Sequence, residues 1–207
     1  MTKIEKVSKK TDPRIIRTRK LLQEATLALS AEKPYSKISI SDITERAGVA
    51  RPTFYLHYKT KDEVIVDYLD GIFKSYLDEI TPYLQQKNGG IYAQKLFEQV
   101  ERNSALLRPL LDPDLSNILI SRFSDYIAYV SQTLIQKGII AIPDPSPEYL
   151  NEFLVAGIAG YFYSVLLVWL EKGMPYTPEQ MTAFLIPFIN NGLTGMNAQL
   201  QEMGYLG

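Results

Sequence analysis

Four polar side chains stand close together in a short segment that opens with Arg-Pro. They are Arg51, Thr53, Tyr55 and His57, within the run Arg51–Tyr58. An arginine can donate two parallel hydrogen bonds to the edge of a guanine, whereas Thr, Tyr and His side chains can reach bases or phosphate oxygens. These residue types suit contact with nucleic acid.

The sequence contains few of the residue types and motifs that catalysis or metal binding requires. The 207 residues include no cysteine and one histidine, which excludes disulfides, thiolate catalysis and centres built from Cys or several His. None of the motifs GxGxxG, GxxxxGK[ST], HExxH and GxSxG occurs. We therefore expect no enzyme activity, no metal site and no cofactor.

Charge is distributed unevenly along the chain. The net charge is −1, yet residues 1–62 carry 14 Lys and Arg against 7 Asp and Glu, and residues 63–207 carry 8 against 16. Ten of the 14 cations lie beyond Lys10, so a solvated basic tail does not account for the excess. A basic first part on an acidic remainder indicates nucleic-acid binding at one end only.

Hydrophobic periodicity predicts an all-α fold of about nine helices, because i, i+3, i+4 spacing recurs and strict apolar/polar alternation is nearly absent. Asp12 and Pro13 mark the start of the first helix, which ends near Lys33 because Pro34 follows. The main later helices are expected at 39–47, 51–58, 91–108, 113–137, 148–172 and 178–203. A further helix is expected after the Thr60–Glu63 capping-box pattern, with Val64 to Ile80 on one apolar stripe before Pro82.

The second and third of these helices are joined tightly. Ser39 and Asp42 have the spacing of a capping box, and Gly48 permits the left-handed turn that ends the second helix. Two helices at such a turn form the helix-turn-helix pattern, whose second helix enters the major groove of DNA. Phe54 is expected to face inward. Ordinary helical bundles also contain short helix pairs with a glycine turn.

A family resemblance covers roughly residues 14–64. The run from Ile40 to Val64, ISDITERAGVARPTFYLHYKTKDEV, resembles the N-terminal signature of TetR-family repressors, and Arg19–Ala25 is similar to the first helix of that family. The resemblance implies a three-helix DNA-binding head followed by a larger helical body that dimerises and binds a small molecule.

The resemblance also implies roles for individual residues. Arg51, Pro52 and Thr53 match the base-facing start of the recognition helix, and Tyr55, His57 and Lys61 match its phosphate-contacting positions. Ser39 matches the helix cap, whereas Ser41 stands where many members carry a basic residue, which leaves a contact from that helix open. Tyr58 replaces the usual Phe, so its hydroxyl needs a partner. The expected DNA-binding set is Ser39, Ser41, Arg51, Pro52, Thr53, Tyr55, His57 and Lys61.

The expected domain organisation has three parts. Residues 1–11 form a flexible basic tail, 12–62 the helix-turn-helix DNA-binding domain, and 63–207 the ligand-binding and dimerisation domain. This body is larger than a DNA-binding head requires.

One segment of the body needs a test against a membrane. Phe153–Leu170 has 18 residues without a charge, but no Lys/Arg cluster flanks it, so a buried helix in an oligomer core is the better interpretation. The resemblance implies a two-fold dimer through the last two helices, although both could instead be central core. The expected dimer contacts are Ala156, Gly157, Gly160, Leu167, Phe188 and Leu193.

Aromatic residues are abundant beyond residue 62, and any one of them could be an ordinary core residue. The resemblance implies that the body binds a small effector, which the sequence does not identify. The expected pocket residues are Tyr83, Phe97, Phe123, Tyr126, Tyr129, Phe162, Tyr163 and Trp169.

The sequence thus predicts a cytoplasmic, homodimeric transcriptional regulator. We expect a repressor that binds a palindromic double-stranded operator and is released by a small-molecule effector. Two alternatives stay open: a helix-turn-helix regulator controlled by a protein partner or by constitutive occupancy, and an activator.

Overall fold

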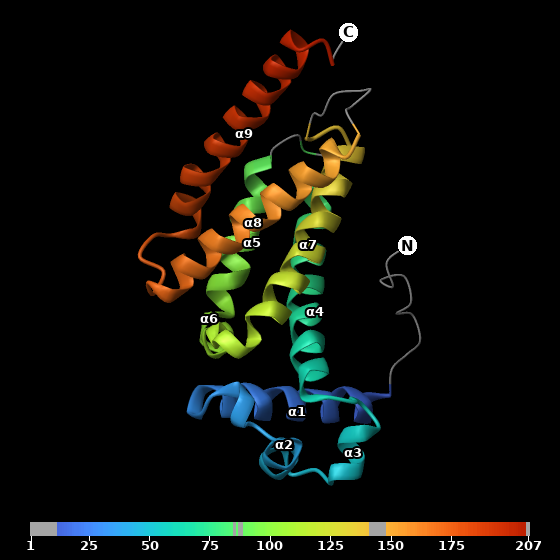
Figure 1. The fold of residues 1–207 in the computed structure, drawn as a ribbon. Coiled ribbons are helices and arrows are strands. Elements are labelled where there is room, and N and C mark those ends of the chain that lie inside the picture. The colour runs from blue at the N-terminus through green and yellow to red at the C-terminus, as the bar shows by residue number, and fades with distance from the viewer. Residues whose placement is uncertain (1–11, 85, 87–88, 141–147, 206–207) are drawn as a thin grey trace. The chain divides into compact units, whose positions relative to one another are not determined.

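The computed structural model describes residues 12–84, 86, 89–140 and 148–205 (Figure 1). Every regular element in these residues is helical, which confirms the expected all-α class. The predicted tail, residues 1–11, lies outside the described residues. The described residues up to Tyr68 form one compact unit, and those from Leu69 onward form a second. The boundary therefore falls inside a helix, six residues beyond the one expected from the sequence.

The nine α-helices of the described residues follow in the expected order. The first unit contains α1 (Pro13–Glu32), α2 (Ile40–Ala47), α3 (Arg51–Tyr55) and the start of α4 (Lys61–Ile80). The second unit contains the rest of α4, followed by α5 (Gly89–Arg102), α6 (Ser104–Leu107), α7 (Ser116–Gln136), α8 (Leu150–Glu171) and α9 (Pro178–Glu202).

Local sequence signals explain where the helices of the first unit begin and end. The Asp12 side chain accepts a hydrogen bond from the Arg14 backbone N–H at 2.8 Å, and Pro13 occupies the first turn of α1. Ser39 and Asp42 form the expected capping box of α2. Gly48 then adopts φ 65°, the left-handed geometry that ends α2 before α3 begins.

The core of the first unit is apolar and tightly closed. Leu22 of α1, Ile43 of α2, Phe54 of α3 and Val64 of α4 are all fully buried. Phe54 therefore faces inward as expected, and its burial leaves the opposite side of α3 in solvent.

In the second unit, α5 packs along α9 and α7 packs along α8. One core cluster joins α5, α7, α8 and α9 around Phe97, Phe162 and Trp169. A second cluster joins α4, α5 and α7 around Tyr76, Tyr92 and Val130. Both clusters lie beside the cavity described below.

Two helices end earlier than the sequence predicts. The helix expected at 91–108 stops at Arg102, because the Asn103 side chain donates to the Gln99 carbonyl at 2.8 Å and competes with the helical backbone. α3 ends at Tyr55 rather than residue 58. The chain continues in a tight turn in which the His57 N–H donates to the Phe54 carbonyl at 2.9 Å.

Candidate nucleic-acid interface and ligand cavity

Arg51 stands exposed at the start of α3 and is held by two neighbouring side chains. Its Nη1 lies 3.4 Å from the Ser41 hydroxyl and its Nη2 lies 3.3 Å from the Tyr55 hydroxyl. The guanidinium carbon also lies 5.9 Å from the centre of the Tyr55 ring. Ser41 thus supports the arginine from α2, a role that sequence reasoning left open. The remaining N–H groups of Arg51 have no partner among the described residues.

The other base-facing candidates share this surface. Pro52 is exposed and Thr53 is half-buried, both in the first turn of α3. Tyr55 is 50% exposed although it is a large aromatic residue, because its neighbour Phe54 takes the inward position. An exposed aromatic hydroxyl next to an arginine can donate to a phosphate.

His57 lies in an open groove between the end of α3 and the start of α1. The groove is lined by Arg14, Ile15, Thr18, Arg19, Leu56 and His57. Three of these side chains carry or can carry positive charge, and Thr18 contributes a hydroxyl. Arg14 and Thr18 were not predicted from the sequence, because only the fold brings α1 beside His57.

Lys61 was expected to contact a phosphate, but its ammonium group already donates hydrogen bonds within the protein. Its ammonium donates to the backbone carbonyls of Tyr35 at 2.6 Å and Ile38 at 2.8 Å, and it lies 4.2 Å from the centre of the Tyr35 ring. These contacts occupy two of its three N–H donors. Lys61 therefore fixes the loop between α1 and α2, and one donor remains for a phosphate.

The Tyr58 hydroxyl has the partner that the sequence called for. It donates to Asp67 at 2.7 Å and accepts from the Arg19 Nε at 3.3 Å. Arg19 and Gln23 also donate to the Asp67 carboxylate, at 2.8 and 2.6 Å. Burial, reinforced by donation to Asp67, raises the pKa of Tyr58. The network ties the end of α3 to α1 and α4, so the exposed face of α3 is held in place.

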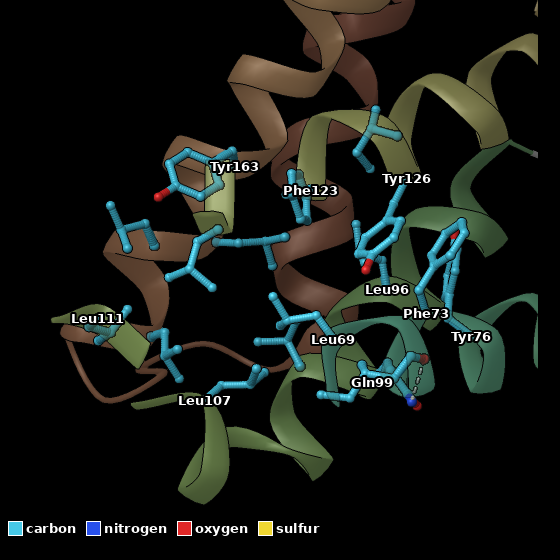
Figure 2. Close-up of a pocket in the computed structure, with 17 residues that line it drawn as sticks. Leu69, Phe73, Tyr76, Leu96, Gln99, Leu107, Leu111, Phe123, Tyr126 and Tyr163 are labelled. Carbon is cyan, nitrogen blue, oxygen red and sulfur yellow. Dashed lines mark hydrogen bonds between the residues drawn. The ribbon is translucent and has the colours of Figure 1, made fainter. Parts of the chain in front are cut away.

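A cavity of about 140 Å³ lies in the second unit, between α4, α5, α7 and α8 (Figure 2). Eight leucines, two isoleucines, a valine and two phenylalanines make up most of its lining. The polar lining residues are Tyr76, Gln99, Tyr126 and Tyr163. Among the described residues, no Asp, Glu, Lys, Arg or His lines the cavity.

Three of the eight aromatic residues expected in a pocket line this cavity, namely Phe123, Tyr126 and Tyr163. The other five lie outside it. Phe97, Phe162 and Trp169 pack on one another in the adjacent core. Tyr83 packs against the second core cluster, and Tyr129 is 42% exposed.

The cavity also contains residues that the sequence did not single out. Phe73 stacks on Tyr126 with ring centres 4.1 Å apart, and Gln99 is buried in the wall. No sequence signal separates these from core residues, because their orientation depends on how four helices meet. Leu167, expected at a dimer contact, is half-buried and lines the cavity.

Parts of α8 and α9 are apolar and exposed. Ala156, Gly157 and Gly160 are exposed on α8, and no side chain lies within 4 Å of where a Cβ would stand at either glycine. Phe188 of α9 is 67% exposed and stacks on Tyr161 of α8, with ring centres 5.0 Å apart. Leu193 is half-buried. Large apolar side chains seldom gather in solvent without a partner.

By length and composition alone, α8 could cross a membrane, and a third of the qualifying window is buried within the second unit. Core helices of water-soluble proteins meet the same criterion. Within the described part of the chain, no group of three or more His, Cys, Asp or Glu could hold a metal ion.

Comparison with known families matches both units. Residues 22–68 match the family described as bacterial regulatory proteins, tetR family, and residues 91–191 match one described as transcriptional regulator C-terminal region. The chain is 40% identical over 74 residues to the HTH-type transcriptional regulator YxbF of Bacillus subtilis; the match covers 35% of the chain and 20% of YxbF. The chain thus spans only a fifth of that relative's length.

A longer match and a solved structure extend the similarity over both units. The HTH-type transcriptional repressor KstR of Mycolicibacterium smegmatis is 26% identical over 160 residues, which cover 74% of the chain and 77% of KstR. The crystal structure of Thermus thermophilus FadR, a repressor in complex with lauroyl-CoA, superposes with a TM-score of 0.57 and 20% identity. That match covers 84% of the chain and 94% of FadR, and it shows a shared fold.

Proposed function

The chain belongs to the TetR family of DNA-binding transcriptional regulators, and we propose that it is a homodimeric cytoplasmic repressor released from a palindromic operator by a small apolar molecule. The observation that carries the DNA-binding part is the exposed guanidinium of Arg51, held by Ser41 and Tyr55 on a helix whose other face is buried. A pre-positioned arginine loses little side-chain freedom on binding a base.

In this proposal, Arg51 reads a guanine and its neighbours secure the helix in the major groove. Pro52 and Thr53 contact base edges, whereas Tyr55, His57 and the third donor of Lys61 contact phosphates. Arg14 and Thr18 extend the phosphate surface because they share the His57 groove. Ser39 contributes as the cap that sets the start of α2.

The exposed apolar face of α8 and α9 supports a dimer. Gly157 and Gly160 leave room for a second helix to approach closely, and Phe188 offers a large apolar side chain beside them. A two-fold axis through this face would pair two α3 helices, and such symmetry suits a palindrome.

The cavity supports control by a small molecule, since a predominantly apolar concave site is typical of ligand pockets. Two relatives are in keeping with this proposal: KstR is named a repressor, and FadR, which shares the fold, holds lauroyl-CoA. A ligand would act by favouring a dimer arrangement that no longer fits the operator.

Selection of bound sequences from a random duplex library tests the DNA-binding part. We expect an inverted repeat with half-sites one helical turn apart, ~34 Å, and an affinity that falls steeply with salt. Arg51→Ala should relax base preference at one position in each half-site, by about 1–3 kcal/mol.

Lys74→Ala serves as the control, because Lys74 is an exposed cation of the second unit. It should leave both base preference and salt dependence unchanged. Unaltered base preference in Arg51→Ala would show that Arg51 does not read a base. If the wild type enriched no sequence from the library, the DNA-binding proposal would be contradicted.

A further inference from the structure

Two of the three tyrosine hydroxyls in the cavity wall have hydrogen-bond partners before any ligand arrives. The Tyr76 hydroxyl donates to the Tyr92 carbonyl at 3.1 Å, and the Tyr126 hydroxyl donates to the Asp70 carboxylate. Burial is the main cause that raises the pKa of both phenols, so both hydroxyls remain protonated donors to these partners. Neither O–H is free to donate to a ligand carboxylate.

Two cations on the helices that line the cavity are also paired. Arg122 forms ion pairs with Asp70 and with Asp125, the latter at 3.3 Å, and its guanidinium lies over the Tyr126 ring. Its Nε has no partner among the described residues, but Arg122 does not line the cavity. Arg102 pairs with Glu79 and Glu98. A carboxylate entering the cavity would therefore meet no unpaired cation among the lining residues.

Gln99 is the buried exception among the polar groups of the wall; the Tyr163 hydroxyl also has no partner among the described residues, but Tyr163 is only half-buried. The Gln99 side chain is buried, and its Nε2 donates to the Ile72 carbonyl at 3.3 Å (Figure 2). Its Oε1 accepts from Arg102 at 2.6 Å. An amide nitrogen carries two hydrogens, so one N–H has no partner among the described residues. Arg102 fixes the orientation of the amide, because only the oxygen can accept from a guanidinium. Gln99 thus offers a donor, while its oxygen already accepts from a guanidinium.

We propose that the cavity binds an uncharged, hydrocarbon-like molecule with a single hydrogen-bond acceptor, which the free N–H of Gln99 recognises, and that it rejects carboxylates and ammonium ions. This inference rests on the proposed effector role of the cavity and specifies its ligand class. A charge transferred from water to this wall would lose its hydration without compensation, whereas a carbonyl or ether oxygen would meet a donor.

The size of the cavity sets the size of the first probes. Engineered apolar cavities of ~150 Å³ take up benzene, and this cavity measures about 140 Å³. Four molecules of one shape separate the contributions. Acetophenone is neutral with one acceptor, isopropylbenzene lacks the acceptor, benzoate is the anionic analogue, and benzylammonium is a cation.

The experiment measures binding of each probe to the full-length protein at neutral pH, by calorimetry and by the shift in melting temperature. Acetophenone should bind at least about tenfold more tightly than benzoate or benzylammonium. It should bind about fivefold more tightly than isopropylbenzene, because one hydrogen bond separates the two. Gln99→Leu should abolish this second difference while leaving isopropylbenzene affinity unchanged.

A matched pair of variants locates the site. Leu119→Phe enlarges a lining residue of α7, and Ile120→Phe enlarges its exposed neighbour. Only Leu119→Phe should weaken acetophenone binding.

Several results would overturn the inference: benzoate or benzylammonium binding as tightly as acetophenone, isopropylbenzene matching acetophenone in the wild type, or none of the four probes binding. Equal effects of the two Phe variants would place the site elsewhere. The wild-type comparisons hold even if a variant fails to fold. The probe experiment contains no DNA, so a failure of the proposed ligand class can be distinguished from a failure of operator binding.

Discussion

Arg51, Ser41 and Tyr55 form the smallest unit of structure on which the proposed DNA recognition depends. In the sequence, Ser41 occupies a position that suggested a missing base contact. In the structure, its hydroxyl lies within hydrogen-bonding distance of the Arg51 guanidinium, so the serine positions the arginine. This pairing joins residues ten apart on two helices, and only the angle of the Gly48 turn brings them together.

Ser41→Ala should therefore weaken operator binding without changing the phosphate contacts. The loss of one positioning contact should cost about 0.5–1.5 kcal/mol of binding free energy, because Arg51 then has to be immobilised on binding. Titration of a labelled operator at several salt concentrations measures both the binding free energy and its salt dependence. A changed salt slope would mean that Ser41 itself contacts the backbone.

Lys61→Ala should have two separable effects. It should lower the free energy of unfolding by about 1.5–3 kcal/mol, since two carbonyls lose a charged donor. It should also flatten the salt dependence of DNA binding by about one unit, because a phosphate contact is lost.

The exposed Lys59 provides the control for Lys61. Lys59→Ala should change stability by no more than about 0.5 kcal/mol. An unchanged salt slope in folded Lys61→Ala would restrict Lys61 to holding the loop between α1 and α2.

At the scale of the helix, the capping box of α2 makes stability depend on pH. The Asp42 carboxylate accepts hydrogen bonds from the Ser39 backbone, from Lys33 and from the Ser39 hydroxyl, which lowers the pKa of Asp42 to about 2. A lowered folded-state pKa stabilises the fold above the unfolded pKa of about 3.9, and this contribution is lost as pH falls towards about 2.

Asp42→Asn should thus unfold at lower urea concentration than the wild type at neutral pH. The difference should shrink progressively between about pH 4 and about pH 2. Urea titrations across this range test the expectation, and a difference that persists undiminished at pH 2 would contradict it.

The same helices show what could be predicted from the sequence. The caps at Asp12 and Ser39 and the turn at Gly48 were predictable, because their partners lie within a few residues along the chain. The break at Asn103 was missed, since a single Asn does not show whether its amide will face solvent or the backbone. Gln99 and Phe73 at the cavity were also missed, because their environment comes from helices far apart in sequence.

At the scale of the whole molecule, the apolar face of α8 and α9 should hold the dimer together. Gly160→Arg adds a long charged side chain where the protomer itself has open space, so the protomer should still fold. Burying that charge against a second copy is costly, and light scattering should therefore show monomers or aggregates.

Gly71→Arg is the matched control, because Gly71 is an exposed helical glycine of α4 that also has open space around it. This variant should remain dimeric. If Gly160→Arg were equally dimeric, the contact surface would lie on other elements.

The cavity and the DNA-binding surface belong to one regulator only if each affects binding at the other. The direct test is to titrate the selected operator with and without a saturating compound that raises the melting temperature of the wild type but not of Leu119→Phe. We expect the compound to weaken operator binding by about 5–150-fold, and the operator to weaken binding of the compound by the same factor. Identical operator affinity in both titrations would show that the cavity does not control DNA binding.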